Sequence, residues 1–348
     1  MEVLIYVIGN KNGYTAFKEV TMSYLEFKGE HCETTAIGVL MHYLGFNYSE
    51  SMLFGLGEGL NFAILPWGTD GFPFLGGRTK QAEIVQCLCK NLDLELIEHR
   101  TTSKKKAWEV VKKYLDQGRP VGLQLDCFYL EYFTSKIHFG GHFAAIVKYD
   151  ESDAYLVDTQ QQGGLMKTSL GSLSLARSEK GPMFGKNLSF IIDKKANEIN
   201  IESSIINALY CNAEKFLNPP ISNFGNKGLL RAAKDIKKWY KASNDIEKDF
   251  SFVATMMEKG GTGGAMFRNL YRDFLDEASG FINDSCIKDA FELYKESAIL
   301  WNELSDTLMA ISRTKEERLL EDVSQLFKDI EAIETVAMNK LLSLKNKA

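Results

Sequence analysis

Histidine and cysteine are both scarce in this chain of 348 residues, with five of the first and six of the second. The cysteines lack the regular spacing of a disulfide framework, and such frameworks are uncommon in chains of this size. Cys87 and Cys89 lie two residues apart in a segment with helical character, so their side chains point to different faces. This spacing argues against a zinc site there. The sequence therefore predicts free thiols and no metal site.

Long hydrophobic runs are also missing, and no stretch approaches the roughly eighteen apolar residues that a membrane span requires. Residues 1–9 lack the basic region and the cleavage site of a signal peptide and are typical of a β-strand. A net charge of −5 gives no reason to expect nucleic acid or an anionic membrane as partner. We therefore expect a cytoplasmic protein that binds neither nucleic acid nor membrane.

Glycine-rich turns are predicted at residues 55–60 and 74–78. The first superficially resembles a dinucleotide fingerprint, but its glycines have the wrong spacing and no strand–turn–helix unit with a downstream acid follows. We therefore reject nucleotide binding. Turns of this kind more often allow the backbone to approach a substrate or a neighbouring strand closely.

The first half of the sequence mixes short strands with amphipathic helices. Residues 141–149 and 154–158 are predicted to form a hairpin around a turn at 150–153. Further strands are predicted at 121–126 and 188–193, and helices at 81–91 and 104–117. These patterns predict an α+β domain with an antiparallel sheet over residues 1–195.

The second half is helical almost without interruption from Ile199 onward. Its last helix carries an apolar stripe from Leu319 to Leu344, and the opposite face is rich in Lys, Glu and Asp. A stripe of this kind is nearly always the core of a helical bundle. We therefore predict an all-α domain over residues 196–348.

One stretch of the first half carries the features of a nucleophile. Apolar residues recur at helical spacing from Ile37 to Leu44, so that a helix is expected to begin near Cys32 and to end at Gly45. A thiol at a helix start faces free backbone N–H groups and the positive end of the helix dipole, which favour its thiolate. The alternative is a small buried apolar residue, as most free cysteines are. This stretch alone favours the alternative.

A cysteine nucleophile needs a base, and the base needs a group that orients it. Three histidines are poorly placed, being adjacent to the thiol, far along its helix or in a charged context: His31, His42 and His99. His138 and His142 remain, and the context of His142 is the stronger one. Two glycines precede it and an apolar strand follows, which would hold the imidazole rigidly at a sheet edge.

Asp158 follows His142 at the end of the predicted partner strand, where a carboxylate can reach the far imidazole nitrogen. Taken singly, His142 is more simply a strand-end histidine and Asp158 a turn residue. The order of a Cys at a helix start, a His on a strand and an Asp on the next strand makes coincidence less convincing. The combination of Cys32, His142 and Asp158 therefore favours a catalytic triad.

Several stretches together resemble the butirosin biosynthesis protein H family, in the right order and over nearly the whole chain. They are EHCETT at 30–35, FGLGEGL at 54–60, GGR at 76–78, DCFYL at 126–130, GGH at 140–142, VD at 157–158, GGAMFR at 263–268 and YRDFLDEA at 271–278. The resemblance implies a branch of the papain-like cysteine protease fold, followed by a helical C-terminal domain.

The activity that this resemblance implies is acyl transfer. Characterised members of the family take an acyl group from a carrier-protein thioester and pass it to an amine, so that an amide forms in natural-product biosynthesis. One relative acts on an aminoglycoside, and others belong to non-ribosomal, thio-templated pathways that include polythioamides of the closthioamide type. The implied partners are an acyl or peptidyl carrier protein and a small amine. No cofactor is implied beyond the carrier's phosphopantetheine arm.

The resemblance also implies roles for single residues. Cys32 would be the nucleophile, His142 the general base and then acid, and Asp158 the orienting acid. The backbone N–H of Cys32 would be one oxyanion donor. Papain-like proteases take the second donor from an upstream Gln, but this chain has none there and carries three other polar residues: Glu26, Lys28 and Glu30. The second donor therefore stays unassigned.

Four polar residues in the shared stretches are candidates for substrate binding: Glu33, Glu58, Arg78 and Tyr129. The alternative for each is a polar contact that stabilises a loop. The glycine-rich segment 260–264 and the adjacent Phe267 and Arg268 are expected either to cover the site or to dock the carrier protein. Two other functions stay open for the chain as a whole, a cysteine hydrolase with the same triad and a non-catalytic binding protein.

Overall fold

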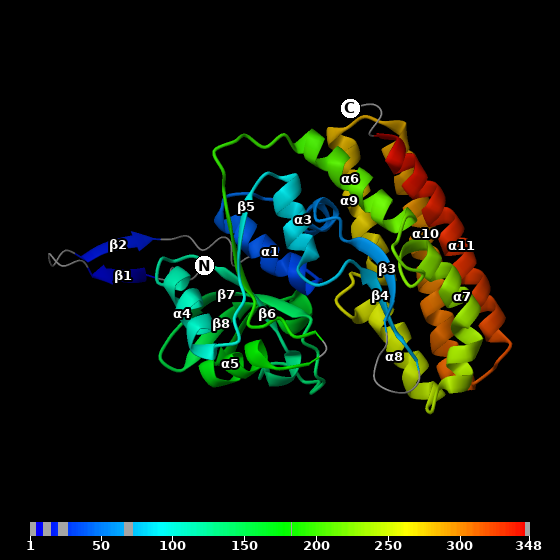
Figure 1. Ribbon diagram of the computed structural model, residues 1–348, viewed down its shortest axis with the longest axis horizontal. Helices are drawn as coiled ribbons and strands as arrows, with labels where there is room; N and C mark the ends of the chain where they lie inside the picture. Colours follow the sequence, from blue (N-terminus) through cyan, green and yellow to red (C-terminus); the bar gives the residue numbers. More distant parts are fainter. Residues whose placement is uncertain (1–4, 10–14, 20–26, 66–71, 182, 345–348) are drawn as a thin grey trace.

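The structure is a computed structural model that describes residues 5–9, 15–19, 27–65, 72–181 and 183–344. A half that mixes strands and helices lies beside a helical half (Figure 1). The strands are β1 (Ile5–Gly9), β2 (Thr15–Glu19), β3 (Leu60–Leu65), β4 (Phe74–Arg78), β5 (Glu95–His99), β6 (Val121–Leu125), β7 (His142–Tyr149), β8 (Asp153–Val157), β9 (Leu165–Ser169) and β10 (Ser189–Asp193). The helices are α1 (Cys32–Tyr43), α2 (Glu50–Leu56), α3 (Glu83–Asn91), α4 (Lys104–Leu115), α5 (Leu170–Ser178), α6 (Ile201–Leu217), α7 (Gly225–Ala242), α8 (Ile246–Lys259), α9 (Arg268–Phe281), α10 (Ser285–Thr314) and α11 (Leu319–Leu342).

Six strands form one sheet in the order β5-β10-β6-β7-β8-β9, and all neighbours run antiparallel. Alternate residues of its strands enter two different cores, as Phe143 and Ala144 on β7 do. Helix α1 packs on one face, and α4 and α5 pack on the other. The predicted α+β class, with an antiparallel sheet followed by a helical region, is confirmed.

Helix α1 begins at Cys32, where the sequence places a helix start. The backbone of His31 is extended, and its side chain accepts a hydrogen bond from the backbone N–H of Thr34, as an N-cap does. The helix ends before Gly45, which adopts a left-handed φ of +83°. Its N–H donates back to the carbonyl of His42 at 2.9 Å. Glycine takes this conformation without steric cost, which is why the helix stops there.

Of the two predicted glycine-rich turns, the first is confirmed and the second is wrong. Residues 57–58 form the turn between α2 and β3, whereas residues 74–78 form strand β4, which pairs antiparallel with β3. Glycine serves close packing at Gly77, because a Cβ there would lie 2.5 Å from the carbonyl oxygen of Met266. The strand therefore approaches the backbone of a 3-10 helix in the helical half, Ala265–Phe267, rather than a substrate or a neighbouring strand.

The two halves of the chain share one hydrophobic core. The β3–β4 hairpin lies against α6 and α7, and the N–H of Ile64 donates to the carbonyl of Asn223 at 2.9 Å. The side-chain amide of Asn212 on α6 donates to the carbonyl of Leu60 at 2.7 Å. The last strand ends at Asp193, but the shared core gives no sharp division, so the predicted boundary at residue 195 stays a prediction. None of the described helices is both long and apolar enough to cross a bilayer.

The apolar stripe of α11 forms much of the bundle core, with two departures from the predicted pattern. Val336 is 49% exposed, whereas Glu334 is fully buried. The Glu334 carboxylate accepts hydrogen bonds from the fully buried Arg268 at 2.7 and 2.8 Å and from the indole N–H of Trp301 at 2.9 Å. A buried carboxylate is tolerated when such partners compensate for the loss of water. Arg268 is thus part of the helical core.

Candidate active site

The structure brings Cys32, His142 and Asp158 together at one end of the sheet. Cys32 is half-buried at the start of α1, and His142 is the first residue of β7. Asp158 directly follows β8, the antiparallel neighbour of β7. Cys32 and His142 line the same cavity, which has a volume of about 320 Å³. Asp158 lies behind the imidazole and is 1% exposed.

The carboxylate of Asp158 fixes the orientation of the His142 ring. Its Oδ2 atom lies 2.7 Å from Nε2 of His142 and also accepts the hydroxyl of Tyr132 at 2.7 Å. Its Oδ1 atom accepts the N–H of Thr159 at 2.7 Å. Because Nε2 is engaged by Asp158, Nδ1 is the ring nitrogen available to a reacting group. Tyr132 has no place in the sequence analysis, since nothing in its local pattern links it to Asp158.

The pKa of His142 lies well above its usual value. Burial alone would lower this pKa. The charges of Asp158 and Cys127, and the hydrogen bonds that both side chains make with the ring, raise the pKa by more than burial lowers it. A raised pKa favours the imidazolium, which in turn stabilises a nearby thiolate. The imidazole of His142, held by Asp158, can therefore act as the base for a cysteine nucleophile in the same cavity.

Cys127 is a second thiol at this site, and the sequence analysis does not single it out. It lies two residues beyond the end of β6, whose last residue Leu125 pairs with His142. Its side chain interacts with His142 and lines the same cavity, although it is only 8% exposed. Two features of the sequence could have identified Cys127. It lies in the stretch DCFYL, and it follows a predicted strand that pairs with the strand of His142.

The loop before Cys32 is held by a carboxylate from α2. Glu50 accepts the N–H of Glu30 at 2.9 Å and that of His31 at 2.8 Å, and it also accepts the hydroxyl of Thr34 at 2.7 Å. Burial raises the pKa of Glu50, while these hydrogen bonds act in the opposite direction. Glu50 thus positions the backbone at the start of α1. The sequence holds no local signal for this contact.

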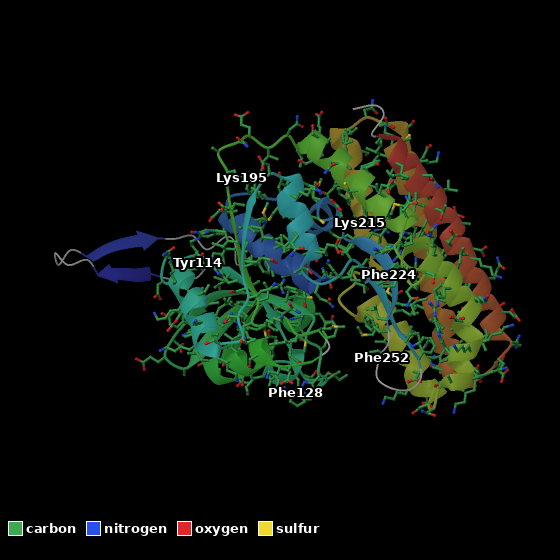
Figure 2. The ribbon with its side chains drawn as sticks, in the orientation of Figure 1. Tyr114, Phe128, Lys195, Lys215, Phe224 and Phe252 are labelled. Carbon is green, nitrogen blue, oxygen red and sulfur yellow. The ribbon has the colours of Figure 1, made fainter. Side chains whose placement is uncertain are left out.

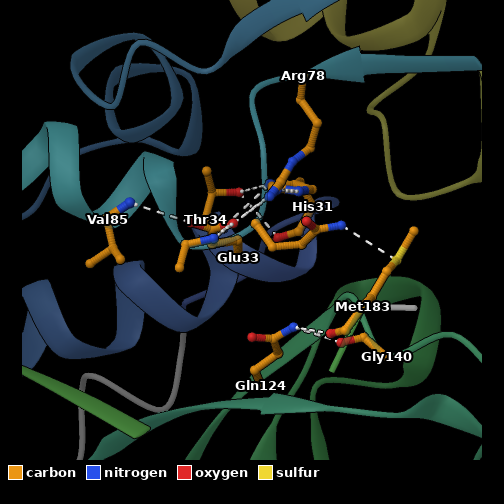
Figure 3. Close-up of polar contacts among 10 residues, drawn as sticks. His31, Glu33, Thr34, Arg78, Val85, Gln124, Gly140 and Met183 are labelled. Atoms are coloured by element: carbon orange, nitrogen blue, oxygen red, sulfur yellow. Dashed lines mark hydrogen bonds and ion pairs between the residues drawn. The ribbon is translucent and has the colours of Figure 1, made fainter. Parts of the chain in front are cut away.

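A second contact joins the loop before Cys32 to the segment that follows Asp158. The carbonyl of Gly29 accepts the N–H of Gln160 at 2.9 Å. Gln124 similarly ties the approach to His142, because its side-chain amide donates to the carbonyls of Gly140 at 2.7 Å and Met183 at 2.8 Å (Figure 3). Hydrogen bonds to backbone carbonyls, from the Gln160 N–H and from the Gln124 side chain, thus set the relative positions of the segments that carry the three candidate residues.

His31 also lines the cavity, but its surroundings differ from those of His142. Its pKa lies well below the usual value, first because the ring is buried and then because Arg78 and His142 are nearby. The ring packs edge-on against Phe267 at 5.2 Å. His31 therefore stays neutral and caps α1.

Glu33 and Arg78 form a buried pair that holds α3 in place (Figure 3). The Glu33 carboxylate accepts the N–H groups of Ala82 at 3.2 Å and Val85 at 3.3 Å, at the start of α3. Burial raises the pKa of Glu33, although Arg78 and the backbone hydrogen bonds oppose this. Neither residue is among those that line the cavity. These contacts are of the kind that stabilises a loop, which was the alternative to a role in substrate binding.

Glu58 and Tyr129 also lie outside the cavity lining. Glu58 is 2% exposed and pairs with Asn91 at 3.0 Å and with Lys215 at 2.8 Å. The hydroxyl of Tyr129 donates to Glu179 at 2.6 Å, on the outside of the sheet half. Each residue stabilises a junction between elements, so neither contact supports the predicted role in substrate binding.

The helical half supplies one wall of the cavity. Phe252 and Met256 reach it from α8, together with Gly260 and Gly261 at the end of that helix. Figure 2 marks Phe252 on α8, beside the sheet half. Gly261 lies next to the loop before Cys32, because a Cβ on it would lie 3.4 Å from the carbonyl oxygen of Glu30. The segment 260–264 therefore borders the candidate site, whereas Glu26 lies outside the described residues.

Comparisons with known proteins agree with the resemblance found in the sequence. Residues 31–159 match the family described as butirosin biosynthesis protein H, N-terminal. Residues 171–341 match a second family, a domain of unknown function designated DUF4872. A solved structure described as a C39-like peptidase from Bacillus anthracis is 16% identical, aligns with 51% of this chain and 98% of its own, and has a TM-score of 0.35.

No curated protein matches the chain. The first family match includes Cys32 and His142 and ends one residue after Asp158. The part of the chain that carries the candidate triad is therefore similar to the butirosin biosynthesis protein H family.

Proposed function

We propose that the protein is a cysteine acyltransferase. It takes an acyl group from a carrier-protein thioester through an acyl-Cys32 intermediate and passes it to an amine. The observation that carries the proposal is the buried His142–Asp158 pair, which faces a cavity that also contains the half-buried Cys32 at a helix start. The match of residues 31–159 to the butirosin biosynthesis protein H family supports the choice of a biosynthetic acyl transfer.

The reaction divides into two exchanges at one carbonyl. His142 takes the proton of Cys32, and the thiolate attacks the thioester carbonyl while the N–H of Cys32 donates to the developing oxyanion. The carrier's thiol leaves with the proton from His142. An amine then attacks acyl-Cys32, His142 takes its proton, and Cys32 leaves as a thiol. The product is an amide, and the enzyme returns to its starting state.

Large apolar side chains line part of the cavity beside polar ones such as Thr134, Gln161 and Gln162, and the apolar part would suit an apolar acyl group. The apolar residues that line it are Phe74, Phe133, Ile137, Phe139, Phe252 and Met256. Apolar walls with a few convergent polar groups are typical of sites for small organic groups. Exclusion of water separates a transferase from a thioesterase, because water competes with the amine for the acyl-enzyme.

The helical half has a direct part in this proposal. Its helix α8 and residues 260–261 form a wall of the cavity, so the acyl group would lie between the two halves of the protein. The carrier protein would deliver its phosphopantetheine arm through the open side of the cavity. The wall formed by α8 and residues 260–261 supports cover of the site by the helical half, and docking of the carrier protein on that half stays a prediction.

An amine is expected to divert the acyl group from water to amide formation. The wild-type protein is incubated with an apolar aryl thioester, with and without a primary amine, and free acid and amide are quantified by mass spectrometry. With amine, we expect amide to be the main product, because acyl transfer requires that the amine reach the acyl-enzyme ahead of water. A boiled sample controls for uncatalysed aminolysis. Acid as the main product at saturating amine would indicate the hydrolase, and no turnover of several thioesters or of a loaded carrier would indicate the binding protein.

Replacing Asp158 by asparagine is expected to move the alkaline limb of the pH–rate profile to lower pH. The Asp158 charge helps to raise the pKa of His142, and an amide removes that charge while keeping a hydrogen-bond acceptor. The imidazolium then loses its proton at a lower pH, and the reactive thiolate–imidazolium pair is lost with it. The acylation rate is measured against pH in stopped-flow experiments.

Tyr132→Phe is the matched control for that experiment. It removes the hydroxyl that donates to Oδ2 of Asp158 but keeps the carboxylate. Its alkaline limb should not move to lower pH. An unchanged profile for Asp158→Asn would contradict the proposed role of Asp158.

A further inference from the structure

A second cavity lies on the opposite face of the sheet from α1. Its volume is about 270 Å³, and it lies between α4 and α5. The lining residues with polar or aromatic groups are Lys104, Lys105, Trp108, Ser174, Arg177 and Asn187. It shares no lining residue with the cavity that contains Cys32. It is therefore a separate feature of the sheet half.

Arg177 is a buried cation without a carboxylate partner among the described residues. It is 4% exposed, and its two terminal nitrogens donate at 3.2 Å to the backbone carbonyls of Ala107 and Asn187. Its Nε atom is buried and has no hydrogen-bond partner in the described part of the chain. Burial lowers the pKa of Arg177 to about 10, with no acidic group acting in the other direction. Burying a charge in this way is unfavourable unless an opposite charge compensates for it.

More positive charge gathers at the mouth of the same cavity. Lys104 and Lys105 occupy the first turn of α4, and no acidic residue lies in that turn. Helix starts normally favour acidic residues, because the helix dipole and the free N–H groups there are positive. Lys105 has one acidic neighbour, Glu109, at 4.0 Å on the exposed surface. The arrangement is unfavourable for an isolated helix and favourable for holding an anion.

An aromatic wall completes the cavity. Trp108 is half-buried, and its ring packs edge-on against Tyr149 with 5.3 Å between centroids. This contact fixes one side of the indole, and the residue lines the cavity together with the apolar Leu173. A ligand with a planar or apolar group would gain contact area there. The cavity therefore has cations that could bind a negatively charged oxygen group and an aromatic and apolar surface against which an organic group could pack.

We propose that this cavity binds a small phosphate ester. The phosphate would lie between Arg177 and the lysines of the first turn of α4, and the organic group would pack on Trp108. Phosphate is favoured over a carboxylate because three cations and the start of a helix converge there, which suits a dianion with several acceptor oxygens. The site is independent of the proposed acyl transfer.

Phenyl phosphate is the probe for the test, and binding is measured by isothermal titration and by the rise of the melting temperature of the full chain. Saturable binding is expected for the wild type. Lys104→Ala is expected to weaken it about tenfold, since a charge-assisted hydrogen bond contributes about this factor. Lys106→Ala is the matched control, because Lys106 is exposed in the same turn but does not line the cavity. Its affinity should stay within about twofold of the wild type.

Three further ligands separate the sources of affinity. Benzoate tests a carboxylate, phenol tests the apolar wall alone, and inorganic phosphate tests the anion alone. We expect phenyl phosphate to bind more tightly than all three. Equal affinity for phenol or benzoate, an equal loss in Lys104→Ala and Lys106→Ala, or no saturable binding to the wild type would overturn the proposal. Both lysine variants change exposed side chains, so the comparison does not depend on whether an Arg177 variant folds.

Discussion

Replacing Cys32 by alanine is expected to abolish the acyl adduct on the protein, whereas replacing Cys127 is expected to leave an adduct in place. The two thiols line the same cavity, and Cys127 interacts with the candidate base. We nevertheless expect Cys32 to be the nucleophile, because it is half-buried at the start of the twelve-residue helix α1, where backbone N–H groups and the helix dipole favour an anion. Cys127 is 8% exposed and begins only a three-residue 3-10 helix, Cys127–Tyr129, which has a much smaller dipole.

The experiment follows the intact mass of each variant after incubation with an aryl thioester in the absence of amine. Wild type and Cys127→Ala should both gain the mass of one acyl group, and Cys32→Ala should gain none. Cys211→Ala on α6 serves as a control for the chemistry of other thiols. Thermal unfolding of all variants shows whether they fold alike. An adduct on Cys32→Ala that is absent from Cys127→Ala would transfer the nucleophilic role to Cys127.

Replacing His142 by alanine is expected to lower the acylation rate by about a hundred- to ten-thousandfold, the range that a positioned general base contributes. The ring is buried and held by Asp158 at 2.7 Å, whereas His31, the other imidazole that lines the cavity, has a lowered pKa and caps α1. Single-turnover measurements at saturating thioester isolate this step from release of the product. The loss should appear in the rate constant rather than in the affinity for the thioester.

His138→Ala is the matched control. His138 was the competing histidine in the sequence, and the structure places it outside the cavity lining, stacked on Phe128 at 4.0 Å and paired with Asp126 at 3.1 Å. Its side chain is 55% exposed, so its removal should leave the acylation rate within about twofold of the wild type. A large loss in His138→Ala with little loss in His142→Ala would reverse the assignment. Rescue of His142→Ala by added imidazole would further support proton transfer by this ring.

Local sequence patterns predicted the backbone of the candidate site well. The helix start at Cys32 follows from helical spacing and from glycine at its end, and the hairpin of β7 and β8 follows from two apolar segments around a short turn. Once the hairpin forms, His142 and Asp158 come together because they stand near the same end of paired strands. These features depend on interactions between residues close in sequence, which is why periodicity and turn residues were sufficient.

The partners of buried polar side chains could not be predicted from the sequence. Glu33, Glu58 and Arg78 were predicted to contact substrate, but the structure gives them partners up to 157 residues away, such as Lys215 for Glu58. Glu50 likewise reaches a loop some twenty residues upstream, and Glu334 is buried on a helix face where exposure was expected. A charged residue has the same sequence signature whether it faces water or a buried partner, because only the packed neighbours decide its solvation.

By itself, the sequence determined the mixed sheet half and the helical half, a family resemblance over residues 31–159, and a short set of candidate residues for one reaction. Local propensity and hydrophobic period carry that information along the chain. The tertiary structure alone decided that Cys127 lies beside His142, that α8 forms a wall of the cavity, and that Arg177 is buried without an acidic partner among the described residues. Such contacts join residues far apart in the chain, and only the packing of the finished fold selects them.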